Sequence, residues 1–453
     1  MTIIQQFLVI VAILLTCIFM GTTIAFSLSF TCIMAIVIFL APSQLLQMGS
    51  IAIRQGTNIN QLVAPLFIMM AEFLTLGDVA TDIFTVLNRA LQKFKGGLAI
   101  SAVLACTVFA ALCGSSPATA AAIGRISIRE MVKHGYRPDF AAGTVAGAGT
   151  LGILIPPSIT FVSYCMITEN SIAKLLMAGV IPGLMLSFMM CISIIIRVRL
   201  NPSLANVDSA EFKNALAADE AIAKAESHAK NQLTKSEVRM NNIKLLVPPM
   251  ILILVVLGSM YLGWATPMES AGVGVIGAFL LVLFRGRFSK GLFSNVMKNT
   301  AKTGNMVMFI TISGLSLSYV VSYLGLAQGI ANIIIGLNVN RYVVIVLLYI
   351  MWYIMGCLLD PGSMIVLTIP FIYPTLMALG FDPIWLGVVA VICVEVGMIT
   401  PPVGFNLFVI KNVSELPISQ VIKGVIPYVG ILTLALIILT IFPEICLFLP
   451  SRM

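Results

Sequence analysis

Two pairs of adjacent prolines are the residues whose type and spacing point most directly to chemistry. Pro156-Pro157 interrupts the apolar stretch LGILIPPSITFV, and Pro401-Pro402 interrupts VGMITPPVGFNLFV. Proline has no backbone N–H and disfavours helix in the residue before it, so each stretch must break as a helix at its pair. In a bilayer, backbone groups freed by a break are tolerated only where protein or water satisfies them, and transporters build midplane binding sites in this way. We therefore expect a binding site where the two breaks meet.

The two breaks belong to an internal repeat with an offset of 245 residues. The turn GYRP at 135–138 matches GFDP at 380–383, and GVIP at 179–182 recurs unchanged at 424–427. Three collinear matches at one offset favour a duplication over chance resemblance between apolar sequences.

The broken backbone offers oxygen ligands for a small cation. Carbonyl groups in residues 152–157 and 397–402 lose their helical partners. Such oxygens suit Na⁺, and no pair of proton-relaying side chains is evident in the sequence. Further oxygens come from Ser115, Ser116, Thr400 and the backbone of residues 356–362. For the two serines, helix capping is an alternative role that is compatible with ion binding.

Helix N-termini at the same breaks favour an anion, because they carry partial positive charge and free N–H groups. No arginine lies in either motif, so we expect a carboxylate held by helix dipoles, hydroxyls and a co-bound cation. The side chains expected to contact it are Ser116, Thr119, Ser158, Thr160, Ser363 and Asn406. Four acids in apolar segments serve either ion coupling or structural hydrogen bonds and caps: Glu72, Glu269, Asp360 and Glu395.

The composition is that of an integral membrane protein. Hydrophobic residues make up 59% of the 453 positions and charged residues 10%, and the mean hydropathy is +1.06. Apolar segments of about 17 to 25 residues recur, which predicts helical spans rather than strands of a barrel. The first of them has no basic region before it, so we interpret it as a retained span. The nine cysteines show no CxxC spacing and are expected to be small core residues.

Two repeats joined by a polar linker position the breaks. Each repeat is expected to hold a re-entrant hairpin of two half-helices and one broken helix, and these parts of both repeats together form a transport domain. The remaining spans form a scaffold. The predicted ranges are 1–199 for the first repeat (hairpin 97–132, broken helix 139–168), 200–243 for a helical linker, and 244–453 for the second repeat (hairpin 342–376, broken helix 385–411).

Smaller features complete the predicted layout. Ser116 is expected to cap the returning half-helix of the first hairpin at Pro117, and Asp360 to cap that of the second at Pro361. Amphipathic stretches at 43–58 and 287–303 are expected along the membrane interface, the second followed by a span at 305–322.

Charge predicts the topology. If each hairpin enters and leaves on one side, a repeat crosses the membrane five times, and the odd count inverts the second copy. With the linker in the cytoplasm, 22 of the 26 basic residues lie inside and only Arg54, Lys174, Arg341 and Arg452 lie outside. Both termini then face the periplasm, and the hairpins enter from opposite faces so that their tips meet near the midplane.

Other classes of function fit less well. A channel needs a continuous polar path or a ring of charges, which the sequence lacks. An enzyme needs a catalytic constellation, and no Ser-His-Asp set, metal-ligand cluster or phosphate loop is present. The net charge of +8 comes from residues flanking spans, so orientation in the membrane explains it better than nucleic-acid binding.

An ordered set of motifs resembles the large membrane subunit of tripartite ATP-independent periplasmic (TRAP) transporters. The set spans nearly the whole chain: GGLAISAVLACTVFAALCGSSPATAAAIG (96–124), GTLGILIPPS (149–158), ATPMESAGVG (265–274), DPGSMIVLTIP (360–370) and VGMITPPVGFNLFV (396–409). The resemblance implies Na⁺-driven uptake across a bacterial inner membrane by an elevator motion. It also implies a separate small membrane subunit, a periplasmic substrate-binding protein, and an organic acid such as a sialic acid or a C4-dicarboxylate as substrate.

The resemblance also implies two pseudo-symmetric Na⁺ sites. The first falls on Ser115, Gly152, Ile155 and Pro157, the last three through their carbonyls. The second falls on Gly397, Thr400 and Pro402 with the region from Gly356 to Gly362. Thr119 stands where members of the family often have aspartate, which leaves the substrate open. The alternative within transport is a stand-alone divalent-anion/Na⁺ symporter of the same architecture without a binding protein.

Overall fold

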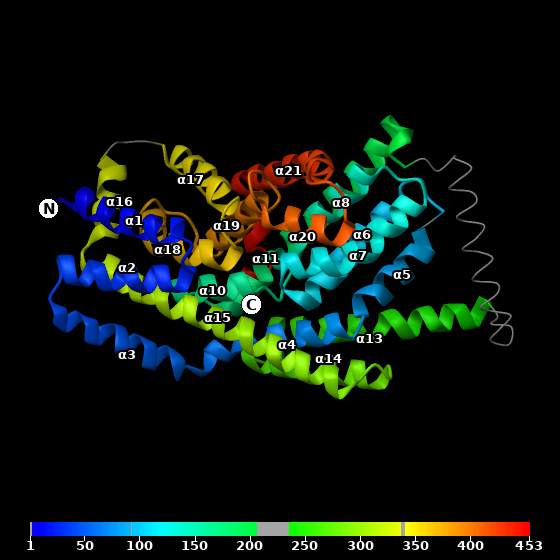
Figure 1. The fold of residues 1–453 in the computed structure, drawn as a ribbon, viewed down its shortest axis with the longest axis horizontal. Coiled ribbons are helices and arrows are strands. Elements are labelled where there is room, and N and C mark those ends of the chain that lie inside the picture. The colour runs from blue at the N-terminus through cyan, green and yellow to red at the C-terminus, as the bar shows by residue number, and fades with distance from the viewer. Residues whose placement is uncertain (1, 92, 206–234, 337–339) are drawn as a thin grey trace.

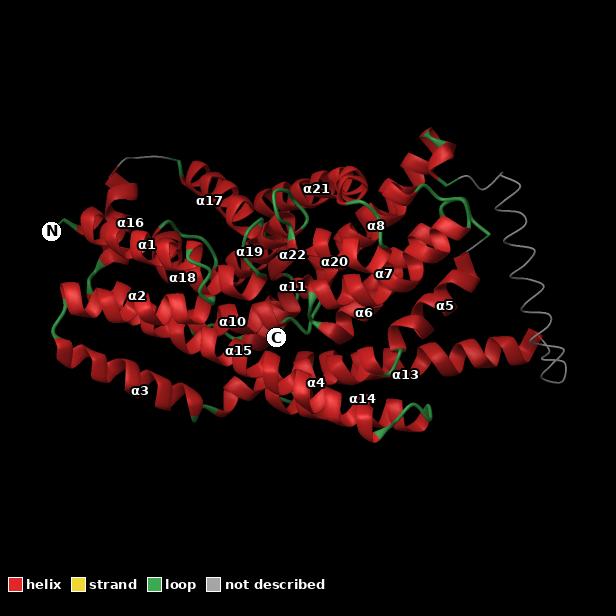
Figure 2. Ribbon diagram, in the orientation of Figure 1, coloured by secondary structure: helices red, strands yellow, loops and turns green. Residues whose placement is uncertain are grey.

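A computed structural model describes residues 2–91, 93–205, 235–336 and 340–453. This part of the chain is built of helices, without a named strand; one isolated bridge pairs Tyr136 with Ala205 (Figure 2). Within it, seven helices are long and apolar enough to cross a membrane, or eight if one bent pair counts as a single span. The expectation of an all-helical membrane protein is confirmed.

Among the described residues, the first half of the chain contains eleven α-helices; Figure 1 labels most of them. They are α1 (Ile3–Phe19), α2 (Ile24–Phe39), α3 (Leu45–Gly56), α4 (Val63–Leu76), α5 (Val79–Leu91), α6 (Gly97–Cys113), α7 (Ser116–Lys133), α8 (Pro138–Gly149), α9 (Leu151–Leu154), α10 (Ile159–Thr168) and α11 (Ile172–Leu200).

The second half repeats this order. Its helices are α13 (Lys235–Tyr261), α14 (Pro267–Phe284), α15 (Lys290–Tyr323), α16 (Leu326–Gly336), α17 (Arg341–Gly356), α18 (Pro361–Ala378), α19 (Pro383–Met398), α20 (Phe405–Ser414), α21 (Ile418–Ile441) and the short α22 (Glu444–Leu447). Helices α7 and α18 begin at residues 116 and 361, and α8 and α19 at 138 and 383, so the offset found in the motifs also holds for the element boundaries.

One difference between the halves corrects an expectation. The stretches 287–303 and 305–322 were expected to be separate, but they form the single 34-residue helix α15. In the first half, a turn at Thr57 and Asn58 separates α3 from α4. At the corresponding place α15 has Gly304, where an added Cβ would lie 3.3 Å from the Cβ of Pro65, so the glycine lets α15 pass close to α4. The polar residues around Lys302 therefore mark a close helix packing and not a break.

The linker lies largely outside the described residues. Helix α11 continues to Leu200 and is followed by a short 3₁₀ turn at Pro202–Leu204. Helix α13 begins at Lys235, nine residues before the predicted start of the second repeat. The prediction of a helical linker at 200–243 falls mainly on residues 206–234, which the structure does not describe.

The two halves interlock at the middle of the molecule. Helix α7 of the first half packs against α20 of the second, and α10 packs against α18. Figure 1 shows these helices gathered at the centre, with α2, α3, α4, α14 and part of α15 along one side. The inverted orientation of the second half stays a prediction.

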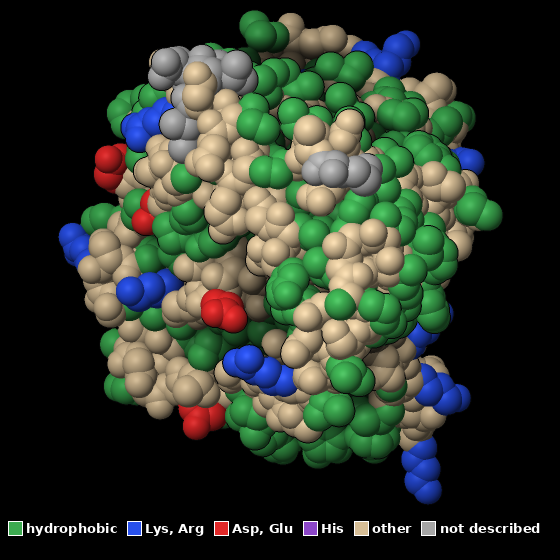
Figure 3. Space-filling view, turned by 90° about the vertical axis from the view of Figure 1, so that its left-hand side faces the viewer, with side chains coloured by type: hydrophobic (Ala, Val, Ile, Leu, Met, Phe, Trp, Pro, Cys, Tyr) green, Lys and Arg blue, Asp and Glu red, His purple; other side chains and the backbone are tan. Residues whose placement is uncertain are grey.

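The outer surface is apolar, as a lipid-facing surface must be. Large hydrophobic side chains such as Phe188, Leu254, Phe284 and Ile441 are more than half exposed. Figure 3 shows one end of the molecule, where hydrophobic side chains predominate and the few charged ones are scattered.

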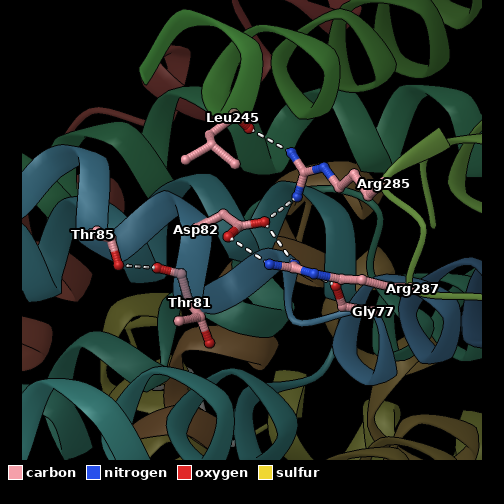
Figure 4. Close-up of polar contacts among 7 residues, drawn as sticks. All are labelled: Gly77, Thr81, Asp82, Thr85, Leu245, Arg285 and Arg287. Carbon is pink, nitrogen blue, oxygen red and sulfur yellow. Dashed lines mark hydrogen bonds and ion pairs between the residues drawn. The ribbon is translucent and has the colours of Figure 1, made fainter. Parts of the chain in front are cut away.

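An ion-pair cluster joins α5 to the turn between α14 and α15 (Figure 4). Asp82 on α5 is buried and contacts both Arg285 and Arg287; the Arg287 Nη1 and Nη2 atoms donate to its two carboxylate oxygens at 2.8 and 3.0 Å. Arg285 also donates to the Leu245 carbonyl oxygen at 2.6 Å, and Arg287 to that of Gly77 at 2.8 Å. Through the two arginines, one carboxylate therefore links the end of α4, the start of α5, the end of α14 and Leu245 of α13.

Candidate functional site

The first hairpin tip lies against the first break through glycine contacts. A Cβ added to Gly152 would lie 2.6 Å from the Ser115 carbonyl oxygen and 2.7 Å from the Thr119 Oγ1 atom. Gly114 ends α6 with φ of +66°, and its own added Cβ would lie 2.6 Å from the Pro157 carbonyl oxygen. These positions need glycine because backbone meets backbone there.

The first break ends one helix at Leu154 and starts the next at Ile159 in a new direction. Helices α8 and α9 run as one rod to Leu154, and α10 leaves it at an angle of 41° after Ser158. Pro156 and Pro157 lack the N–H groups that would bond the carbonyls of Gly152 and Ile153 in a helix. The Ser158 hydroxyl accepts from the Phe161 N–H at 3.2 Å and so starts α10.

The second hairpin meets the second break in the same way. A Cβ added to Gly397 would lie 2.5 Å from the Cα and carbonyl carbon of Gly356. The Gly404 N–H donates to the Cys357 carbonyl oxygen at 3.0 Å, which ties the loop before α20 to the end of α17. Thr400 lies between them, and its hydroxyl donates to the Val396 carbonyl oxygen at 2.6 Å. Each break is thus paired with the hairpin of its own half.

A cavity of about 220 Å³ lies where both tips and both resuming helices meet. Four α-helices begin at its wall, because residues of the first turns of α7, α10, α18 and α20 line it. Helix α15 closes the opposite side. The lining residues are Gly114, Ser115, Pro117, Ile153, Ile159, Thr160, Ser163, Met306, Val307, Ile310, Asp360, Pro361, Gly362 and Phe405. Four positive helix ends around one space favour a negatively charged occupant.

The residues expected to bind Na⁺ are distributed between the two tips and breaks. Ser115 and Gly362 line the cavity, and Gly356 faces Gly397 across the contact of the second tip with its break. Ile155, Pro157 and Pro402 lie in the breaks themselves, beside Gly152 and Thr400. The carbonyls of residues 152 and 153 lack a proline N–H partner, and the hydroxyls of Ser115 and Thr400 retain free lone pairs. Hard oxygen ligands of this kind fit a small monovalent cation.

Of the six side chains expected to contact substrate, Thr160 lines the cavity. Ser158 caps α10, and Ser363 is buried in the first turn of α18. The remaining three, Ser116, Thr119 and Asn406, are also fully buried, behind the first tip.

The capping prediction at the first tip is wrong by one residue. Ser115 is the N-cap of α7, accepting from the Ala118 N–H at 3.5 Å, while Ser116 is already helical. The reason is that proline is also compatible with the second helical position, where the N–H has no partner either. At the second tip the prediction is confirmed: the Asp360 carboxylate accepts from the Ser363 N–H at 3.1 Å.

The other acids in apolar segments have separate roles. Glu269 forms a capping box with Thr266 at the start of α14. Glu72 accepts from the Asn299 amide at 2.9 Å. Glu395 is buried in α19 and accepts from the Ser116 hydroxyl at 2.9 Å, so it joins the two halves.

Sequence reasoning missed the wall that α15 contributes. Met306, Val307 and Ile310 are apolar residues in an apolar span, and nothing in their pattern separates them from residues that face lipid. Only the packing of α15 against α10 and α18 places them at the cavity.

Known proteins are similar to this chain in sequence. A family model described as "Tripartite ATP-independent periplasmic transporter, DctM component" matches residues 11–445. The C4-dicarboxylate TRAP transporter large permease protein DctM of Pseudomonas aeruginosa is 37% identical over 393 residues, covering 86% of both chains. The sialic acid TRAP transporter large permease protein SiaM of Vibrio cholerae is 26% identical over 398 residues, covering 87% of both.

A solved structure supports the fold alone. The YdaH transporter of Alcanivorax borkumensis superposes with a TM-score of 0.61 over 91% of this chain and 89% of that one, at 13% sequence identity. The family match and the two breaks with their paired hairpins agree across nearly the whole chain. The chain therefore belongs to the DctM family, the large membrane permeases of tripartite ATP-independent periplasmic transporters.

Proposed function

We propose that this permease takes up an organic acid across the bacterial inner membrane together with Na⁺, by an elevator motion. The observation that carries the proposal is the cavity shared by both hairpin tips and both broken helices. Four helix N-termini favour a carboxylate, while the Asp360 carboxylate and the carbonyls at the breaks favour a cation beside it. Relatives named for C4-dicarboxylate and for sialic acid support a substrate of this class.

The position of the cavity supports the proposed elevator motion. Its walls come from the hairpins and broken helices on one side and from α15 on the other. Sliding of the first group past α15 exposes the cavity to one face of the membrane and then to the other. Helices α11 and α21 travel with the moving group, because Gly179 and Gly424 bring them into backbone contact with Leu154 and Asp139 of the first broken helix. This extends the moving group beyond the hairpins and broken helices.

The tripartite arrangement supplies the partners. We propose a periplasmic binding protein that delivers the acid and a small membrane subunit as a separate chain. Both termini are proposed to face the periplasm, as the distribution of basic residues predicts. Uptake into proteoliposomes holding the permease and its small subunit is expected only with both a Na⁺ gradient and the binding protein. Equal uptake without the binding protein would favour the stand-alone symporter instead.

Ser115→Ala and Pro157→Ala test the first Na⁺ site. Ser115→Ala removes a predicted ligand, and Pro157→Ala removes part of the break that frees backbone ligands. For each variant we expect the Na⁺ concentration for half-maximal uptake to rise about tenfold, which corresponds to about 1.4 kcal/mol of binding free energy. Na⁺ titration of uptake measures this. Ser50→Ala is the control, because this hydroxyl bonds only its own helix in α3. Unchanged Na⁺ activation in both variants would count against the site.

Gly152→Ala tests whether the first tip must lie against its break. The added methyl group meets the Ser115 carbonyl oxygen, the Thr119 hydroxyl and the Ser116 Cα atom within 2.8 Å, so the tip must move. We expect a loss of about 1–3 kcal/mol of stability and uptake below a tenth of the wild-type rate. Gly272→Ala in α14 is the control, since an added Cβ there has no neighbour within 4 Å. Wild-type uptake by Gly152→Ala would show that the contact is dispensable.

A further inference from the structure

A buried polar cluster connects the two halves behind the first hairpin tip. The Ser116 hydroxyl at the start of α7 donates to Glu395 Oε2 of α19 at 2.9 Å, and the Asn406 Nδ2 of α20 donates to the same hydroxyl oxygen at 2.6 Å. All three residues are at most 1% exposed. The cluster therefore joins the first tip to both arms of the second broken helix.

Two oxygens of this cluster have no partner. Glu395 Oε1 and Asn406 Oδ1 are both buried and accept no hydrogen bond. The Asn406 amide cannot simply be reversed, because Ser116 has one hydroxyl proton and Glu395 already accepts it. While Glu395 is ionised, both free oxygens are acceptors only, and no rearrangement among these three side chains satisfies them.

The Glu395 carboxylate also lacks a counter-ion. Among the described residues, no lysine, arginine or histidine forms an ion pair with it. An isolated buried carboxylate is strongly unfavourable, so it either takes up a proton or needs a positive charge beside it. A cation that binds oxygen satisfies both free acceptors and compensates the negative charge at the same time.

We propose that Glu395 and Asn406 bind a third Na⁺, in addition to the two at the breaks; this inference rests on the proposed Na⁺-coupled function. Glu395 Oε1 and Asn406 Oδ1 are its side-chain ligands. The site differs from the two others because it is made of side chains and carries a full negative charge.

The position of the cluster gives the third ion a role. Ser116 follows Ser115 of the first predicted site, and Glu395 precedes Gly397 of the second by two residues. An ion held here compensates the carboxylate between the two carbonyl sites and holds the first tip against α19 and α20. Its loss leaves the two other sites intact but reduces the number of ions that stabilise the assembled cavity.

Glu395→Gln tests the assignment. The amide has the shape of the carboxyl group without its charge. We expect equilibrium binding of ²²Na⁺ to the purified permease with its small subunit to give three ions for the wild type and two for the variant. Glu72→Gln, which removes a carboxylate of α4 outside the cluster, is the matched control and keeps three ions.

Thermal unfolding provides a second measurement that does not depend on transport. Without Na⁺, Glu395→Gln is expected to melt at the wild-type temperature or above it, because a buried unpaired charge has been removed. With saturating Na⁺, the variant is expected to gain less stabilisation than the wild type. Glu395→Asp keeps the charge on a shorter side chain, and it is expected to retain the third ion with at least threefold weaker affinity.

The outcomes separate this inference from the proposed function. A wild-type protein that neither binds ²²Na⁺ nor is stabilised by it overturns Na⁺ coupling as a whole. A wild-type protein that binds Na⁺ while Glu395→Gln binds the same number, with equal stabilisation, overturns only the third site and leaves a buried water as the partner of the two oxygens. Unchanged affinity in Glu395→Asp also overturns it.

Discussion

Gly424→Ala is expected to destabilise the protein by about 3 kcal/mol, because two backbones touch at this residue. An added Cβ would lie 1.8 Å from the Asp139 carbonyl oxygen and 3.0 Å from the Gly143 Cα atom. Neither neighbour is a flexible side chain, so α21 must move away from α8. The separation also disturbs the hydrogen bond of 2.8 Å between the hydroxyls of Thr144 and Tyr428.

The same helix supplies the control. Gly430 lies in α21 six residues further on, and an added Cβ there has no neighbour within 4 Å. Gly430→Ala is expected to leave stability unchanged or to raise it slightly, because alanine is the better helix former. Thermal melting of the purified variants in one detergent measures both. Equal melting temperatures for the two variants would mean that α8 and α21 do not pack as closely as described.

Asp82→Asn is expected to cost about 3 kcal/mol of stability. The asparagine keeps the size of the side chain, but Arg285 and Arg287 lose the carboxylate that both contact. Removing one partner of a buried ion pair leaves an uncompensated charge, which costs about 3–5 kcal/mol; the lower end applies because the Arg287 side chain is 35% exposed.

Asp78→Asn controls for the loss of a negative charge near α5. Asp78 is exposed just before this helix, and its φ of +55° is a conformation that asparagine also tolerates. Its melting temperature is expected to match that of the wild type. If Asp82→Asn and Asp78→Asn have the same melting temperature, the ion-pair cluster contributes nothing measurable to stability. Packing alone then holds α4, α5, α13 and α14 together.

Local signals in the sequence predicted most of the helices. The proline pairs predict both breaks because a missing N–H ends a helix wherever it occurs, and Asp360 before Pro361 predicts the start of α18. The prediction failed where polar residues fit both the end of an amphipathic stretch and the interior of a longer helix. Lys302 and Thr303 look like the end of an interfacial stretch, yet they continue α15, because Gly304 allows this helix to cross Pro65.

The candidate site was predictable in its backbone and less so in its side chains. Gly397 follows from the repeat, because it matches Gly152 at the offset of 245, whereas its contact with Gly356 does not. The direction in which Ser116 and Asn406 point does not follow from the repeat either, because it depends on how α7 packs against α20 and on the hydrogen bond of Ser116 with Glu395 of α19. Two residues expected to contact substrate therefore lie in the cluster with Glu395, and the apolar wall from α15 could not be predicted at all.

That wall has a consequence for how such permeases diversify. Met306, Val307 and Ile310 face the cavity but belong to a helix that contributes none of the predicted ion ligands. Exchanges among side chains of different bulk at these three positions change the shape offered to the cargo and leave the coupling machinery untouched. In a permease of the proposed kind, the choice of nutrient and the use of the ion gradient can therefore be altered independently during evolution.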